Sequence, residues 1–477
     1  MPGWLIAAVI ALFFVVVFAR TFAFGPQAQA LPEPLDVSLD EERVARDIQA
    51  VIRVKTVSFQ DKSLEDRQAF EEFPRLLRKL YPRLHEKLVQ ERIGERGILY
   101  RWPGRRSDKP GVLMAHYDVV PVQEETWDRP PFSGDIENGV LWGRGTLDTK
   151  CTLVGVMEAA EKLIWEGFVP ENDLYLAFAG DEEIFGRGAP DIVAELTRRG
   201  VTPAFVLDEG GAVVENVFPG VKEPCALVGL GEKGMMNVSF EALSPGGHAS
   251  TPPPHTAAGI VARAVTRVEG RPFPFRLTPA VRQMFDGLGR RSGFIYRMIF
   301  ANLWCFAPLL NMLCKKSGGE MNALVRTTCA FTRMSGSPAH NVLPQKAMAG
   351  ANLRLIGGDT MESALERLKK TVGDDRVSVT VLDGTNPSPC SLAGGEAWDR
   401  LKTAIGQTWP GAVTAPYLMV AASDSRHYAS ISHHVYRFSP LALTLAERRS
   451  IHADNERIPL DKLYDLVRFY VRLIRLM

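Results

Sequence analysis

The sequence lacks several patterns that would assign it to common classes of protein. Its six cysteines include no Cys-x-x-Cys pair, which argues against a zinc finger and a dense disulfide framework but leaves room for one or two disulfides. The formal net charge of the 477 residues is only +1, so no basic surplus is available to neutralise phosphates, and we expect no nucleic-acid partner. The sequence also has no Gly-x-Ser-x-Gly elbow, which argues against a serine hydrolase.

One long hydrophobic run stands at the N-terminus. Residues 5–19 carry no charge, and Arg20 and a Phe-rich tail follow them. With Trp4 and the tail, the run approaches the roughly 20 apolar residues that cross a bilayer. A signal peptide usually carries a Lys or Arg before its apolar run, and none precedes Leu5. However, Ala28-Gln29-Ala30 is a small-x-small cleavage site. The interpretations are an uncleaved anchor, a cleaved signal and a buried helix; the first two give a membrane-anchored or secreted protein with its main domain outside the cytoplasm.

Three apolar runs end in side chains that can bind metals. Residues 111–116 lead to His116 and Asp118, residues 174–179 lead to Glu182 and Glu183, and residues 204–207 lead to Asp208. Each run is typical of a buried strand, and active sites of open α/β sheets lie where such strands end. Adjacent carboxylates repel each other unless one binds a metal and the other transfers protons. Three strand ends of this kind indicate a site.

Further candidates lie between and after these strands. His116 and Asp118 are two positions apart, so both point to the same side of a strand, and Asp118 is suited to orient His116 as a ligand. Asp148 follows a glycine-rich turn and precedes a helical pattern at 152–164. An Asp there is most often a helix N-cap, but its two oxygens could also bridge two metals. Four later histidines compete as a further nitrogen donor: His427, His433, His434 and His452.

In their order, these motifs resemble the signatures of the carboxypeptidase S and aminoacylase family of co-catalytic zinc metallopeptidases. Within it, the likeness is to the branch of carboxypeptidase S and the N-fatty-acyl-amino-acid synthase/hydrolases, and it covers about residues 40–477. The motifs are His116-Tyr-Asp118, Gly143-Arg-Gly-Thr-Leu-Asp148, Gly180-Asp-Glu-Glu183, Asp208-Glu-Gly-Gly211 and Gly246-Gly-His-Ala-Ser250.

The resemblance implies a site for two zinc ions per subunit. His116, Asp148 and Asp208 would hold one ion, and Asp148, Glu183 and His452 would hold the other. The family varies between Asp and Glu at one ligand, and Glu209 is the weaker candidate beside Asp208.

The resemblance also implies roles outside the metal ligands. Asp118 would orient His116, and Glu182 would take a proton from the attacking water and return it to the leaving amine. His248 would stabilise the developing oxyanion, from the other subunit if the chain dimerises. Three residues match positions that hold the substrate carboxylate: Asn341, Arg354 and Arg426. For each arginine a surface ion pair is the competing interpretation.

The fold implied is α/β, with a three-layer αβα catalytic domain, a mixed and mostly parallel sheet, and an inserted smaller α+β lid or dimerisation domain. The expected units are a membrane anchor or signal (1–30), a first catalytic segment (31–233), the lid (234–355) and a second catalytic segment (356–477). The sequence pattern agrees, because residues 235–242 alternate like a strand, 256–268 have helical spacing, and 347–355 indicate a returning strand. A homodimer would form through the lid.

One segment of the lid, residues 294–313, is apolar nearly all round. Arg297 and Asn302 argue against a second membrane span. The segment is expected to be a lid helix in a dimer interface, or an apolar element near the bilayer or an acyl chain.

Together these observations predict a zinc-dependent hydrolase of an amide bond next to a free carboxylate. The small-molecule substrate would be a peptide with a free C-terminus or an N-acyl amino acid, and the reaction could also run towards synthesis. The alternative is an inactive membrane-anchored binding or scaffold protein of the same fold. Every chemical position is filled, including Glu182, which argues against that alternative.

Overall fold

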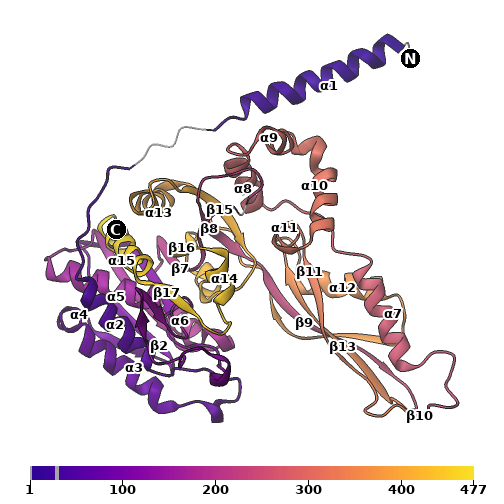
Figure 1. The fold of residues 1–477 in the computed structure, drawn as a ribbon, viewed down its shortest axis with the longest axis horizontal. Coiled ribbons are helices and arrows are strands. Elements are labelled where there is room, and N and C mark those ends of the chain that lie inside the picture. Colours follow the sequence, from indigo (N-terminus) through magenta and orange to yellow (C-terminus); the bar gives the residue numbers. More distant parts are fainter. Residues whose placement is uncertain (1–2, 27–31, 217) are drawn as a thin grey trace.

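The computed structural model describes residues 3–26, 32–216 and 218–477. The candidate cleavage site at residues 28–30 lies outside the described residues. The N-terminal run forms α1 (Gly3–Ala23), which lies at one end of the molecule, away from both large sheets (Figure 1). All six cysteines are free, so the disulfides that the sequence left room for are not formed.

The larger sheet has eight strands, and its centre is parallel. The strand order is β1 (Gln90–Ile93), β2 (Gly97–Trp102), β6 (Asn172–Ala179), β3 (Arg106–His116), β7 (Phe205–Val214), β16 (Val435–Leu443), β8 (Cys225–Glu232) and β15 (Val413–Met419). β6, β3, β7 and β16 run in one direction, β1 and β2 pair antiparallel at one edge, and β8 runs antiparallel to β7 and β16. The mixed sheet of the predicted α/β fold is therefore present.

Helices cover both faces of this sheet and make three layers. Leu113 and Ala115 of β3 join the larger core, whereas Val112 and Met114 join a smaller core on the opposite face, as alternation along a strand requires. The larger core packs on α2 (Glu41–Arg53), α5 (Lys150–Trp165), α13 (Gly395–Thr408) and α15 (Leu460–Arg475). The smaller core packs on α6 (Gly188–Arg198) and the short helix η4 (Asp424–Ser430).

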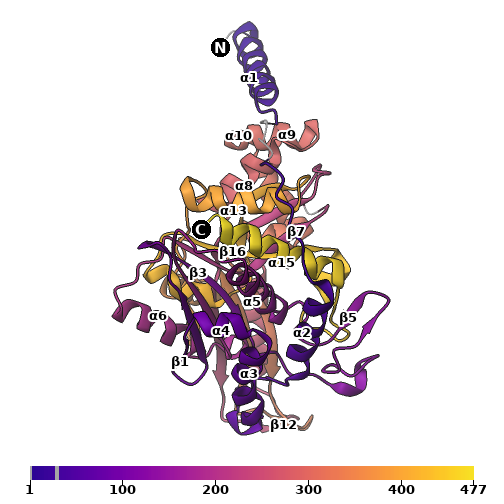
Figure 2. The same ribbon diagram turned by 90° about the vertical axis from the view of Figure 1, so that its left-hand side faces the viewer.

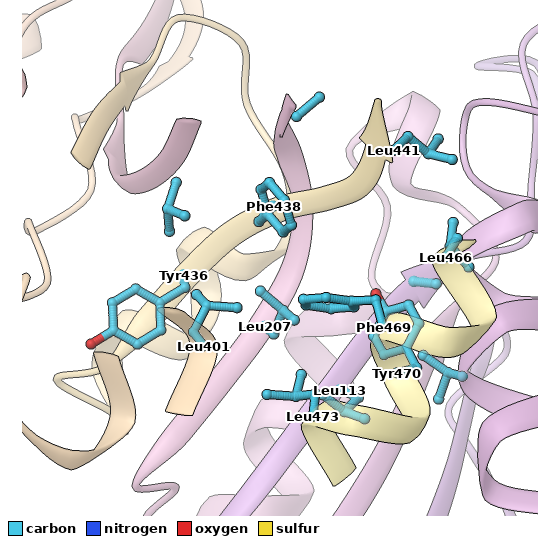
Figure 3. Close-up of a cluster of buried hydrophobic side chains, with 14 of the residues drawn as sticks. Leu113, Leu207, Leu401, Tyr436, Phe438, Leu441, Leu466, Phe469, Tyr470 and Leu473 are labelled. Atoms are coloured by element: carbon cyan, nitrogen blue, oxygen red, sulfur yellow. The ribbon is translucent and has the colours of Figure 1, made fainter. Parts of the chain in front are cut away.

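The last helix, α15, lies across the centre of the larger core. In its first half the buried positions have helical spacing, at Leu463, Leu466 and Val467, and its second half is buried on all sides from Phe469 to Ile474. Figure 3 shows Phe469, Tyr470 and Leu473 of this helix beside Leu113 of β3 and Leu207 of β7.

The remaining short elements border the larger sheet. They are η1 (Lys62–Leu64), α3 (Arg67–Leu80), α4 (Pro82–Lys87), η2 (Glu124–Thr126), η3 (Glu182–Ile184), α14 (Leu445–Ser450), and a three-stranded sheet of β17 (Arg457–Pro459), β5 (Val140–Trp142) and β4 (Ile136–Glu137). Figure 2 shows α2, α3, α4 and β5 on the side of the molecule away from α1.

The second large sheet is antiparallel and has its own core. Its order is β11 (Thr328–Ser335), β13 (Lys346–Leu355), β9 (Gly234–Leu243) and β14 (Val377–Thr385), with α7 (Ala257–Glu269) and α12 (Met361–Val372) packed on it. A small pair, β10 (Gly247–His248) and β12 (Val342–Leu343), lies at its far tip (Figure 1). Because β14 pairs with β9 along its length, a boundary at residue 355 would split this sheet. We propose that the lid ends near residue 385.

Four helices that lie between β10 and β11 in the sequence pack on the larger core. They are α8 (Pro279–Gly289), α9 (Phe294–Ala301), α10 (Leu303–Ser317) and α11 (Gly319–Leu324). Phe285, Phe300 and Leu310 belong to the larger core, not to that of the second sheet. The single helix expected over residues 294–313 is two helices, bent by 116° at Asn302. At this turn the Asn302 side chain is buried and donates to the carbonyl oxygens of Val17 and Met298.

Candidate metal centre

His116 stands at the carboxyl end of β3 with both ring nitrogens engaged. Its Nε2 lies 3.0 Å from Asp148 Oδ1 and 3.3 Å from Glu209 Oε1. Its Nδ1 lies 3.0 Å from the Asp118 carbonyl oxygen and 3.4 Å from Asp118 Oδ1. Nε2 is therefore the nitrogen that faces the other candidate ligands, and Asp118 holds the ring from behind.

Asp118 connects two of the predicted strand ends. Its side chain is fully buried and accepts hydrogen bonds from the peptide nitrogens of Glu182 and Glu183 at 3.1 and 3.2 Å, and from Ser58 Oγ at 2.7 Å. One carboxylate thus fixes both the His116 ring and the start of η3, where the paired glutamates lie. The orienting role expected for Asp118 stays a prediction.

Asp148 lies between two imidazoles. Its Oδ1 is 3.0 Å from His116 Nε2, and its Oδ2 is 2.9 Å from His452 Nε2. The same His452 nitrogen is 3.1 Å from Glu183 Oε1. Of the four competing histidines, His452 is the one that reaches this group. The contacts with Asp148 and Glu183 raise the pKa of His452 to about 10.

Asp208 and Glu209 take different positions, and Glu209 is the one that lies beside His116. The carboxylate of Glu209 faces His116, whereas Asp208 Oδ2 accepts a hydrogen bond from the Ser425 peptide nitrogen at 2.9 Å. Adjacent residues of a strand point to opposite sides, so only one of them can face His116. Glu209 therefore stays a ligand candidate beside Asp208, and Asp208 contacts the segment that carries Arg426.

Glu182 is buried beside these candidate ligands, but its carboxylate is not among those in short contact with the imidazoles. Its ligand atom clusters with those of His116 and Glu209 within 4.8 Å. Burial raises the pKa of Glu182 well above its ordinary value, and although His116 opposes that effect, Asp424 and Glu209 add to it. A carboxylate with a raised pKa can take up a proton and pass it on, which is the task of a general base.

Two further acidic residues at this site were not expected from sequence patterns. Glu456 is fully buried, and its carboxylate accepts hydrogen bonds from the peptide nitrogens of Leu147 and Asp148. Asp424 is buried near Asp208, and burial raises its pKa to about 8. The only signal for either was its closeness in sequence to a candidate residue, His452 or Arg426.

The predicted substrate residues do not all lie at this cluster. His248 and Asn341 are exposed near the tip of the second sheet, where His248 Nδ1 lies 2.7 Å from Ser250 Oγ, and Figure 1 shows β10 far from the larger sheet. Arg426 in η4 donates to the Ser423 carbonyl oxygen at 2.7 Å and lies over the Phe185 ring. Among the described residues, no acceptor lies within hydrogen-bonding distance of the Arg354 guanidinium in β13, and burial lowers its pKa.

The donor set fits divalent metal ions. In tetrahedral zinc sites with bonds of about 2.0–2.1 Å, ligand atoms stand roughly 3.3 Å apart. The imidazole and carboxylate atoms here are separated by 2.9–3.3 Å. Burial raises the pKa of Glu183, and burial together with the charge of Asp148 raises that of Glu209 to about 8. The residues that could hold metal ions here are therefore His116, Asp148, Glu183, Glu209 and His452.

Comparisons with known proteins show the family and the fold. The sequence matches Peptidase family M20/M25/M40 over residues 112–476. An N-fatty-acyl-amino acid synthase/hydrolase of Xenopus tropicalis is 36% identical over 442 residues, which are 91% of this chain and 86% of that protein. A probable carboxypeptidase S-like protein of Dictyostelium discoideum is 33% identical over 461 residues, 94% of this chain and 88% of that protein. The crystal structure of an M20 family metallo-carboxypeptidase of Sulfolobus solfataricus has the same fold, with a TM-score of 0.67 and 17% identity, and the match covers 92% of this chain and 99% of that one.

Proposed function

The chain belongs to Peptidase family M20/M25/M40, and we propose that it hydrolyses an amide bond next to a free carboxylate with the help of two zinc ions. The observation that carries this proposal is the position of Asp148, whose two carboxylate oxygens lie 3.0 and 2.9 Å from the Nε2 atoms of His116 and His452. A carboxylate shared in this way suits a bridging ligand. Imidazole and carboxylate donors are those of catalytic zinc sites.

The proposed ligands divide into two sets around Asp148. His116, Asp148 and Glu209 would hold one ion, and Asp148, Glu183 and His452 would hold the other. Bound zinc ions polarise a carbonyl and lower the pKa of water.

The other residues of the site move or orient groups. Glu182 is the proposed base, which takes a proton from the attacking water and delivers it to the leaving nitrogen. Because the peptide nitrogens of Glu182 and Glu183 both donate to Asp118, the base and one ligand are held in a fixed relation to His116.

Recognition of the substrate carboxylate is proposed for Arg354 and Arg426, with Asn341. The Arg354 guanidinium is half-buried, and no acceptor within the described residues satisfies it, so it is free to bind a carboxylate. His248 and Asn341 are exposed at the far tip of the second sheet. We therefore propose that they serve the site of a partner subunit in a homodimer, with the second sheet as the lid and dimerisation unit.

The substrate class follows from what the two relatives' names have in common. An N-fatty-acyl amino acid and a peptide with a free C-terminus both present an amide nitrogen next to a carboxylate. One site can cleave either, and it can also catalyse the reverse condensation where both products are concentrated. An inactive scaffold is disfavoured, because such a protein would have no need to keep Glu182 buried beside the proposed ligands.

Matched substrates test this proposal on the full chain. N-acyl amino acids and blocked dipeptides would each be compared with the same compound whose carboxylate is converted to an amide, before and after removal of metal by a chelator. We expect hydrolysis of the free acids, little hydrolysis of the amides, loss of activity with chelator, and recovery with zinc. Equal rates on acids and amides would contradict the carboxylate requirement, and full activity without metal would contradict the metal site.

A further inference from the structure

The N-terminal helix α1 is packed against α9 and α10, and we call these three helices the apolar helix cluster. The ring of Phe294 in α9 lies 6.5 Å from that of Phe18 and 5.7 Å from that of Phe22. The ring of Trp304 in α10 lies 5.8 Å from that of Phe13. Both views of the fold place α9 and α10 next to α1 at the same end of the molecule (Figures 1 and 2).

Polar groups in this contact are bonded within the protein. Arg20 donates from Nε and Nη2 to the Ala301 carbonyl oxygen at 3.3 and 3.1 Å. Asn302 Nδ2 lies 3.2 Å from both the Val17 carbonyl oxygen and the Thr21 hydroxyl, and the Asn302 and Thr21 side chains are fully buried. A contact with its polar groups paired internally can persist where water is absent.

The outer surface of the cluster is apolar. Within α1, side chains such as Val9, Leu12 and Val15 are more than 60% exposed. On α9 and α10, Ile295 is 69%, Trp304 is 59% and Met312 is 57% exposed. The opposite side of these two helices is fixed, because Phe300 and Leu310 lie in the larger core. Exposed apolar side chains held together on a rigid support mark an interaction surface.

The length of α1 determines what this surface contacts. α1 has 21 residues, and a window of 18 residues within it has a mean hydropathy of 2.6. The helix is therefore roughly 30 Å long, which is about the thickness of the hydrocarbon core of a bilayer. The whole helix is needed to cross that core. Phe13 lies about two helical turns, or roughly 10 Å, before Arg20. If α1 crosses a bilayer in its docked position, the side chains beside Phe13 and Phe18 must lie at the depth of the acyl chains.

We propose that α9 and α10 enter the near leaflet of the membrane beside α1, so that the protein meets lipid through the whole apolar helix cluster. The bend of 116° between them suits a hairpin that enters and leaves one leaflet. The flanks carry Lys315 and Lys316 in the last turn of α10, and Arg290 and Arg291 before α9, which also pair with Asp286 and Glu223; these cations suit an anionic lipid surface. This placement does not depend on the proposed hydrolytic activity.

The depth of Trp304 tests the proposal. The full chain would be reconstituted into phosphatidylcholine and phosphatidylglycerol vesicles, with and without bromine atoms on the acyl chains, and the quenched fraction of the tryptophan emission measured. Trp4 and Trp304 are the two tryptophans of the apolar helix cluster, so Trp304→Phe should lower the quenched fraction by about half. Trp165 is 65% exposed on α5 and is the control, because lipid should not quench it. Trp165→Phe removes unquenched emission and should therefore raise the quenched fraction.

A second pair of variants changes the surface without removing the probe. Ile295→Asp should draw α9 towards the headgroups and lower the quenching of Trp304, whereas Leu392→Asp, at a residue 65% exposed beside the larger sheet, should leave it unchanged. If Trp304→Phe leaves the quenched fraction unchanged or raises it, Trp304 lies outside the lipid and the proposal is overturned. A second copy of the chain covering α9 and α10 would give that result.

Discussion

The carboxylate of Glu456 holds the peptide nitrogen of Asp148. Glu456 Oε1 accepts hydrogen bonds from the nitrogens of Asp148 at 3.2 Å and Leu147 at 2.7 Å, and Oε2 accepts one from Arg144 Nη1 at 2.7 Å. Glu456 also lies shortly after His452 in the sequence. One buried side chain therefore fixes both the proposed bridging carboxylate and the segment that brings in the second histidine.

We expect Glu456→Gln to weaken metal binding although Glu456 is not a proposed ligand. An amide offers one acceptor oxygen where two are used, and Arg144 loses its buried partner, which costs about 3–5 kcal/mol of stability. Metal affinity, measured by competition with a chelator on protein shown to be folded by circular dichroism, should fall roughly 10–100-fold. Glu166→Gln, which removes a more exposed partner of Lys162 and Arg475, is the control and should keep its affinity. Unchanged affinity in Glu456→Gln would show that the Asp148 loop does not need this support.

Glu182 and Glu183 are neighbours with different proposed tasks. Replacing each by Gln should distinguish proton transfer from metal binding. Glu182→Gln should keep two zinc ions per chain and lose roughly 100-fold or more in kcat, because only the proton transfer is removed. Glu183→Gln should lose zinc as well as activity, because Glu183 Oε1 contacts His452 at the proposed second ion. Metal content by mass spectrometry and the rate on an N-acyl amino acid give the two results. A Glu182→Gln protein with full activity would disprove the base assignment.

The different directions of Asp208 and Glu209 predict opposite effects of two conservative substitutions. Glu209→Gln should reduce the metal content to about one ion per chain, because it removes one of only three proposed ligands to that ion. Asp208→Asn should leave the metal content intact and act on stability or KM, since Asp208 Oδ2 instead binds the Ser425 peptide nitrogen. Loss of metal in Asp208→Asn with retention in Glu209→Gln would restore the assignment that the sequence favoured.

The stability of the metal-free protein should fall as the pH rises. Burial raises the pKa of Glu209 from 4.5 to about 8 and that of Asp424 from 3.8 to about 8. Both groups bind their protons more tightly in the folded chain, so their contribution is complete below about pH 4 and is lost as the pH rises through 8. His452, with its pKa raised from 6.5 to about 10, acts in the same direction.

Melting curves between pH 5.5 and 8 test this expectation. With chelator, Tm should decrease as the pH rises. With zinc, Tm should increase, because the ligands must lose their protons before they bind the ions. The same slope in both conditions would mean that these carboxylates do not form the metal site.

The sequence by itself determined the types of residue at the site and the strands that deliver them. Apolar runs that end in His116, in the paired glutamates after residue 179, and in Asp208-Glu209 indicate buried strands and acidic loops, and β3, β6 and β7 confirm those strands. The N-terminal hydrophobic helix and the terminal helix α15 were equally predictable, because their patterns are local and regular.

Tertiary structure alone decided which of two adjacent acids faces His116, and that Glu456 closes the Asp148 loop. A local pattern gives the period of a strand but not which side of it faces the site, and hydrogen bonds such as the one from Asp148 to Glu456 join residues 308 positions apart. The membership of β14 in the second sheet and the break at Asn302 were hidden for the same reason. Each depends on partners, β9 and α1, that only the folded chain brings near.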